Sequence, residues 1–245
     1  MQWADSGLVI GVRRHGETSA VLDLLTREHG RHLGLVHGGR SRRMQPVLQP
    51  GNTVQAVWRA RLDEQLGTYS VEAETLRSPR LIGSRLALYG LATLSALLRA
   101  LPERDPHPAL FAEAEALVDH LDDPALAPEA SVRFELLLLA ELGFGLDLTS
   151  CAATEATTDL AWVSPRSARA VSRGAGEPYR DRLLALPPFL VGEGRSNRPS
   201  RAELADAFAL TGHFLAAHAL GPRDLHLPEE RARFVGLCLE TADAS

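Results

Sequence analysis

The strongest structural signal in the sequence is the stretch LVIGVRRHGETSAVLDLLTREHGRHLGLV, residues 8–36. Its apolar residues fall into three runs, at 8–12, 19–25 and 31–36. Gly16 and Gly30 lie with polar neighbours in the gaps between these runs. Short apolar runs bounded by glycine and polar residues are typical of antiparallel strands joined by tight turns. The stretch therefore predicts three consecutive β-strands.

Two further strands are predicted on the C-terminal side of this stretch, at 53–58 and 67–73. Five strands within the first ~75 residues, with a turn about every 8–12 residues, indicate a small antiparallel barrel or sandwich. A barrel closes its own edges, which a sheet of this size would otherwise leave unpaired. Trp58 alternates with its neighbours as a core residue would, so we expect it inside.

From Ser78-Pro79 onward the apolar residues recur at helical spacing. The predicted helices span about 81–98, 108–121, 128–142 and 199–219, with a last one from about 228.

Residues 146–180 differ from their surroundings, because Thr, Ser, Gly and Pro dominate them around one apolar patch at 160–163. They predict an irregular insert with one or two short strands. We therefore expect an α+β multidomain protein. Its β-barrel domain covers 1–78, and its mainly α-helical domain covers 79–245 and carries the small β insert.

The composition narrows the class of protein. The 245 residues are 45% hydrophobic, enough for a sizeable core, and no apolar run approaches the roughly 20 residues that span a membrane. The N-terminus lacks the basic segment and apolar segment of a secretory signal. Cys151 and Cys238 cannot form a disulfide framework. These features predict a cytoplasmic protein with no membrane segment.

The charge is distributed unevenly along the chain. All 26 basic residues are arginine, and the formal net charge is −5. Residues 1–62 contain nine arginines and four carboxylates, a balance of +5, so the remainder carries −10. A basic N-terminal module joined to an acidic remainder predicts an anionic partner for the first part of the chain only.

The candidate anion-binding residues centre on VHGGRSRRMQPVLQPG, residues 36–51, which follows the third predicted strand. The Gly-Gly pair lets the backbone approach a ligand closely, and arginine forks bind phosphates through charge and paired hydrogen bonds. The alternative is a solvated charged loop. The candidate phosphate-binding residues lie on this loop and the neighbouring strands: Arg13, Arg14, Arg27, Arg31, Arg40, Arg42 and Arg43.

The kind of anion is narrowed by the motifs that the sequence lacks. It contains neither GxxxxGK[ST] nor GxGxxG, so a polymer backbone is favoured over a nucleotide phosphate. Small barrels commonly bind single strands by combining charge with aromatic stacking. Aromatic residues are few here, which favours backbone binding with little sequence preference.

Several motifs resemble those of the RecO family of recombination mediators. They are GETS at 16–19, GGRSRR at 38–43, LQP at 48–50, RFE at 133–135 leading into LGFG at 142–145, and LAWVSPR at 160–166. The set covers most of the chain in the family's order. The resemblance implies an OB-fold followed by a helical domain.

The resemblance also implies a function. Members bind single- and double-stranded DNA, anneal strands, and help to load the recombinase RecA onto strands covered by single-strand-binding protein. The implied protein partners are RecR and the acidic C-terminal tail of single-strand-binding protein. The implied location is the nucleoid of a bacterial cytoplasm.

The sequence departs from the family pattern in the insert, where many members carry four zinc-binding cysteines. Cys151 occupies the first of these positions, whereas Thr154, Ser172 and Ala175 align with the others. A structural zinc site requires four ligands, usually Cys or His. We therefore expect no zinc, and we expect the insert to be stabilised by packing through Trp162 and Tyr179.

Arg133 is the candidate partner-binding residue of the helical part. It could pair with an acidic group of its own domain, or it could receive a carboxylate of a partner, such as the acidic tail that the resemblance implies. In the second interpretation Phe134 and nearby leucines supply an apolar floor for that tail.

No catalytic residues are predicted, because the sequence shows no GxSxG elbow, no HExxH motif and no paired carboxylates. The expected function is therefore that of a non-enzymatic DNA-binding mediator. Two alternatives remain: an adaptor whose basic barrel binds acidic protein segments, and an enzyme that processes nucleic acid.

Overall fold

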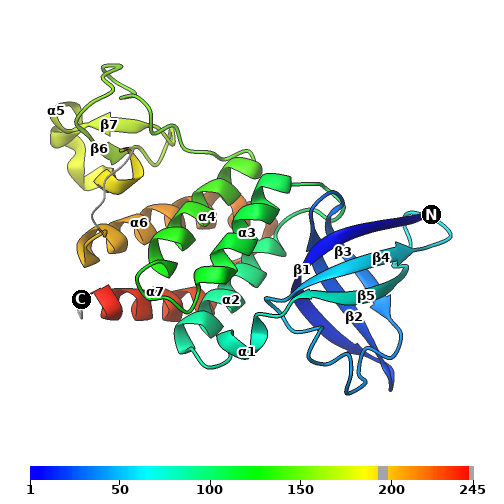
Figure 1. Cartoon of the computed structure of the whole chain (residues 1–245). Coiled ribbons are helices and arrows are strands. Elements are labelled where there is room, and N and C mark those ends of the chain that lie inside the picture. The colour runs from blue at the N-terminus through cyan, green and yellow to red at the C-terminus, as the bar shows by residue number, and fades with distance from the viewer. Residues whose placement is uncertain (193–197, 243–245) are drawn as a thin grey trace. The chain divides into compact units, whose positions relative to one another are not determined.

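The computed structural model describes residues 1–192 and 198–242 (Figure 1). The chain divides into two compact units, Met1–Asp122 and Asp123–Ser245. Each unit has a core of its own. None of the described helices is both long and apolar enough to cross a membrane.

The first unit begins with a closed five-stranded barrel. Its strands are β1 (Gln2–His15), β2 (Ser19–Thr26), β3 (Gly30–Val36), β4 (Thr53–Arg59) and β5 (Thr68–Thr75), in the order β1-β2-β3-β5-β4. The first half of β1 pairs with β4 and the second half with β2. A single parallel pair, Leu35 with Thr68, joins β3 to β5. This is the topology of an OB-fold, as expected.

The barrel core is built by alternate side chains of the strands. Trp58 is fully buried there, as predicted, with Val9, Leu22 and Leu24 around it. The indole N–H of Trp58 donates a hydrogen bond to the carbonyl of Leu66 (3.0 Å), so burial leaves this polar group paired.

Three helices complete the first unit: α1 (Ser78–Leu81), α2 (Arg85–Leu98) and α3 (Pro108–His120). The single helix predicted at 81–98 is therefore interrupted. The Ser84 hydroxyl accepts a hydrogen bond from the N–H of Ala87 (3.2 Å), so it caps a new helix rather than continuing the old one.

A buried polar cluster joins the barrel strands to this helical layer. The Oδ1 of Asn52 accepts hydrogen bonds from the N–H groups of Arg77 (2.8 Å) and Ser78 (2.9 Å). Its amide nitrogen donates to the carbonyls of Pro46 (2.8 Å) and Val47 (3.1 Å). Asn52 thus connects the end of the arginine-rich loop to the start of α1.

The second unit contains α4 (Ala127–Glu141), α6 (Arg201–Phe214) and α7 (Glu229–Ala242). A π-helical segment, η3 (Leu215–Leu220), and a short 3-10 turn, η4 (Gly221–Arg223), extend α6. The insert, for which one or two short strands were predicted within 146–180, contains a three-stranded sheet in the order β7-β6-β8, and its last strand lies beyond residue 180. Its elements are β6 (Leu160–Val163), β7 (Ala170–Ser172), α5 (Arg173–Gly176), η1 (Glu177–Arg182), β8 (Leu184–Ala185) and η2 (Pro188–Leu190).

Of the two aromatic residues expected to pack inside the insert, only Trp162 does so. Trp162 is partly buried, and a Cβ at Gly176 would clash with its indole ring, so close approach of Gly176 allows the ring to pack. Tyr179, in contrast, is 61% exposed and does not belong to the core of the insert. The prediction for Tyr179 was wrong because this residue lies on a 3-10 turn that has no buried residues.

Candidate nucleic-acid interface

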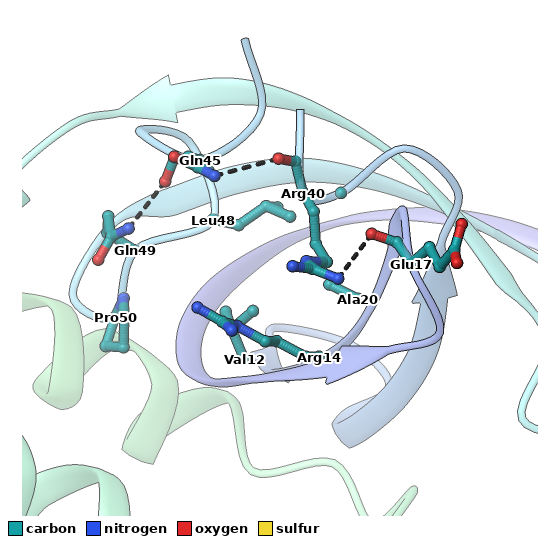
Figure 2. Close-up of a pocket in the computed structure, with 10 residues that line it drawn as sticks. Val12, Arg14, Glu17, Ala20, Arg40, Gln45, Leu48, Gln49 and Pro50 are labelled. Atoms are coloured by element: carbon teal, nitrogen blue, oxygen red, sulfur yellow. Dashed lines mark hydrogen bonds between the residues drawn. The ribbon is translucent and has the colours of Figure 1, made fainter. Parts of the chain in front are cut away.

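A hollow of about 510 Å³ lies between the β1–β2 hairpin and the loop that follows β3 (Figure 2). Its lining residues come from these two segments: Val12, Arg14, Glu17, Ala20, Gly39, Arg40, Gln45, Leu48, Gln49 and Pro50. The side chains of Arg14 and Arg40 approach the hollow from different segments (Figure 2). We call this feature the loop-side hollow.

Arg40 fastens the loop to the hairpin. Its Nη1 donates hydrogen bonds to the carbonyls of Gly16 (3.0 Å) and Glu17 (2.6 Å), and its backbone N–H donates to the carbonyl of Thr18 (3.0 Å). The side chain is half-buried. Arg40 therefore shapes the hollow as well as adding positive charge to its wall.

Gly39 allows the loop to lie this close to the strands. A Cβ at this position would lie 3.0 Å from the Cβ of Ala20 and 3.1 Å from the carbonyl oxygen of Val36. The preceding Gly38 has a positive φ of 66°, which favours glycine. The Gly-Gly pair thus positions the arginines that follow it.

Arg14, Arg42 and Arg43 provide the accessible charge. All three are exposed, and in the described part of the chain no carboxylate forms an ion pair with any of them. Glu17 is the one acidic side chain on the wall of the loop-side hollow. Of these three arginines Arg14 lines the hollow, whereas Arg42 and Arg43 lie on its loop. Exposed guanidinium groups without a carboxylate partner favour an anion with several oxygen acceptors.

The other three predicted DNA ligands lie elsewhere. Arg31 forms a bidentate pair with Asp23, with Nε–Oδ1 and Nη2–Oδ2 distances of 3.1 Å. The guanidinium of Arg27 lies 5.3 Å from the ring centroid of Phe111. Arg13 lines a different hollow of the barrel. Of the predicted set, the structure therefore brings Arg14 and Arg40 into the lining of the loop-side hollow, and it places Arg42 and Arg43 on the loop beside it.

Aromatic residues contribute little to the loop-side hollow, since none of the described residues that line it is aromatic. Trp58 and Tyr69 are in the core, and the partly buried Trp3 stacks on His29 with a centroid distance of 4.1 Å. Burial, with Arg104 nearby, lowers the pKa of His32 to about 4, so His32 is neutral near pH 7. The hollow is thus suited to phosphates more than to stacked bases.

Arg133 and Phe134 lie in the second unit, on α4. Arg133 is half-exposed, donates to Glu129 (2.7 Å) one turn earlier and donates to the carbonyl of Phe189 (3.2 Å). Phe134 is only 1% exposed, so it is a core residue and cannot form the expected apolar floor. Helical periodicity would have identified this, because Phe134 shares a face with the buried Leu138.

The residue that follows them is the centre of a buried ion pair. Glu135 receives Arg231 through Nε (2.7 Å) and Nη2 (2.8 Å), and it accepts a hydrogen bond from the hydroxyl of Thr211 (2.5 Å). Arg231 also donates to the carbonyl of Phe208 (2.9 Å). This cluster joins α4, α6 and α7, and no short-range motif in the sequence indicates it.

The insert does not gather metal ligands. In the described part of the chain no three His, Cys, Asp or Glu side chains are placed to bind one ion. Cys151 is buried, and its Sγ accepts a hydrogen bond from the N–H of Ser172 (3.2 Å). Burial disfavours its thiolate, but hydrogen bonds from Ser172, Thr154 and Ala153 outweigh burial and lower the pKa of Cys151 to about 6.

We expect the thiols of Cys151 and Cys238 to ionise at widely different pH values. Cys151 should form a thiolate near pH 6, whereas burial raises the pKa of Cys238 to about 12. The folded pKa of Cys151 lies below its ordinary value of 9.0, so its contribution to stability should be full above that value and lost as pH falls through 6. Thiolate absorbance in the ultraviolet, followed from pH 5 to 9, should rise in one step that Cys151→Ser abolishes. If the absorbance showed no step below the ordinary pKa of 9.0, the prediction of a hydrogen-bonded thiolate at Cys151 would be contradicted.

The comparisons with known proteins agree with the sequence motifs. Residues 1–78 match the family "Recombination protein O N terminal", and residues 83–225 match "Recombination protein O C terminal". The chain is 64% identical over 241 residues to a DNA repair protein RecO of Methylorubrum extorquens, covering 97% of this chain and 98% of the relative.

Other relatives give the same result. The DNA repair protein RecO of Methylobacterium nodulans is 64% identical over the full length of both chains, and that of Mesorhizobium japonicum is 56% identical over 96% of this chain and 92% of its own. The resemblance found in the motifs is therefore confirmed, and the chain belongs to the RecO family of DNA repair proteins.

Proposed function

We propose that the chain is a non-enzymatic mediator of recombinational repair that binds DNA through the loop-side hollow. The observation that supports this most directly is the pair Arg14 and Arg40 on the wall of a hollow whose described lining has no aromatic residue, with the exposed Arg42 and Arg43 on the same loop as Arg40. Guanidinium groups recognise phosphates wherever they occur along a strand, so both single- and double-stranded DNA are acceptable ligands.

The mechanism is electrostatic. Arginines that neutralise the phosphates of one strand lower its repulsion toward a complementary strand, which favours annealing. Because Arg40 and Gly39 fix the loop against the hairpin, little ordering is required when the strand binds. A strand bound by its backbone leaves its base edges free to pair.

The proposed protein partners are RecR, the acidic tail of single-strand-binding protein and, indirectly, RecA at the bacterial nucleoid. Arg133 is the candidate contact for the acidic tail. Its present partner Glu129 is an exposed carboxylate one helical turn away, and exposed pairs of this kind contribute only about 0.3–0.5 kcal/mol. A carboxylate from a partner could therefore replace Glu129 at small cost.

The test of DNA binding is a salt series with a labelled single-stranded oligonucleotide. In Arg14→Ala/Arg42→Ala/Arg43→Ala the log–log salt slope should fall by about 2, because each phosphate that an arginine neutralises adds roughly 0.7 to the slope. The affinity should fall about 100-fold near 0.1 M salt. Arg40 is left in place because its hydrogen bonds maintain the loop.

A matched control removes three exposed arginines outside the hollow: Arg61, Arg85 and Arg182. It removes the same net charge, and we expect its slope and affinity to stay close to those of the native chain. Equal losses of affinity in both variants would overturn the assignment of the site. Binding that does not depend on salt would favour the adaptor alternative, and turnover of DNA or phosphate esters would favour the enzyme alternative.

A further inference from the structure

The outer face of the β1–β2 hairpin bears a second hollow, of about 300 Å³, which we call the helix-side hollow. It lies within the first unit and is lined by Gly11, Val12, Arg13, Val21, Asp23, Arg31 and Arg99. Arg99 directly follows α2 and was not among the predicted DNA ligands.

The helix-side hollow carries surplus positive charge. Among the described residues that line it, Asp23 is the one carboxylate; it is 7% exposed and is already paired with Arg31. The Nε of Arg99 lies 3.7 Å from the same carboxylate. Asp23 thus compensates one of the three guanidinium groups that line the hollow, which leaves the described lining with a surplus of two positive charges.

Arg99 is held in place by the backbone of β1. Its Nη2 donates a hydrogen bond to the carbonyl of Ile10 (2.7 Å). A Cβ at Gly11 would lie 2.7 Å from that nitrogen, so the absence of a side chain at Gly11 allows the guanidinium to lie over the strand. The Arg99 side chain is nonetheless 48% exposed, so it can still reach a ligand.

The two hollows adjoin at Val12, which lines both, and the alternation of β1 directs the next two residues to different hollows. Arg13 and Arg14 are consecutive residues of the strand, and consecutive side chains project to opposite faces. Arg13 is paired in register with Val21, which lines the helix-side hollow. Arg14 is paired with Ala20, which lines the loop-side hollow. The hairpin therefore contributes one arginine to each of the two adjoining hollows.

We propose that the helix-side hollow is a second binding site for the phosphate backbone of a nucleic-acid strand, with Arg13 and Arg99 as its contacts and Arg31 as the residue that positions Asp23. The inference rests on the proposed function, because it assigns the loop-side hollow to a first strand. With both sites filled, two strands lie beside one hairpin, one at Arg14 and one at Arg13. Their phosphates are then neutralised by different arginines.

The test counts the strands that the full-length chain binds. The probe is an oligonucleotide of about 6 nucleotides without self-complementarity, near the short end of the site size of an OB-fold, so that one molecule cannot fill both hollows. Equilibrium titration at low salt should give two bound oligonucleotides per native chain. Arg13→Gln/Arg99→Gln should bind one, and the matched variant Arg14→Gln/Arg43→Gln should also bind one.

Annealing of longer complementary strands gives a second readout. Arg13→Gln/Arg99→Gln should slow annealing by about tenfold or more, because it removes two charge-assisted hydrogen-bond donors to phosphate. Arg13→Lys/Arg99→Lys retains the charge and should recover most of the rate. Arg13→Gln alone changes an exposed residue, so it should fold normally and still lower the affinity of the second oligonucleotide.

The two possible failures are distinguishable. Unchanged stoichiometry and annealing in Arg13→Gln/Arg99→Gln, together with weaker binding in Arg14→Gln/Arg43→Gln, would overturn the second site and leave the proposed function intact. Unchanged binding in both variants would overturn the proposed function as well, and the second site with it.

Discussion

Replacing Glu135 by alanine should lower the free energy of unfolding of the second unit by about 3–5 kcal/mol. The carboxylate is 3% exposed and receives two hydrogen bonds from Arg231. Its removal leaves the guanidinium of Arg231 buried without a countercharge. Water cannot solvate that charge unless the packing of α4, α6 and α7 opens.

Urea denaturation followed by circular dichroism measures this decrease. Glu129→Ala is the matched control, since it removes an exposed carboxylate from the same helix, and it should cost about 0.5 kcal/mol or less. Glu135→Leu/Arg231→Met removes both charges at once and should recover most of the stability. If Glu135→Ala were as stable as Glu129→Ala, the ion pair would not stabilise the unit.

Asn52→Ala should cost the first unit about 3 kcal/mol, because several buried backbone groups lose their partner at once. Two N–H groups at the start of α1 and two carbonyls at the end of the arginine-rich loop are bonded to this one side chain. The residue is fully buried, so water does not replace those bonds in the folded state.

The same variant should also weaken DNA binding, because the loop that lines the loop-side hollow ends at Asn52. Gln55→Ala is the control, since Gln55 is exposed on the adjacent strand β4 and should change stability by about 0.5 kcal/mol or less. Thermal unfolding of the three proteins measures the stability. Equal midpoints for Asn52→Ala and the native chain would contradict the role of Asn52.

The fold was predictable because its signals are local. Apolar runs and glycine turns indicate the strands, and leucine spacing indicates the helices. The break before α2 was missed because capping by Ser84 acts against a periodicity that continues through it. The buried position of Trp58 followed from strand alternation, whereas Tyr179 has an aromatic ring but no periodicity to place it.

The site was predictable only in part, because charge in a sequence does not reveal its partner. Arg31 and Arg42 both belong to the basic N-terminal module. Arg31 is paired with Asp23, whereas Arg42 is exposed. Asn52 and Glu135 were missed for a related reason. Asn52 is bonded to a residue 25 positions away and Glu135 to one 96 positions away, so only the folded chain brings these partners together.

The hydrogen bonds of Arg40 have one more consequence. They join the loop to the hairpin, and none of the described residues that line the loop-side hollow offers a stacking group. Every nucleotide of a strand presents the same phosphate to these walls, so a shift by one nucleotide exchanges equivalent contacts. If the proposed function is correct, a bound strand should therefore slide past the barrel at little cost, and it should reach the alignment in which its bases match those of a second strand.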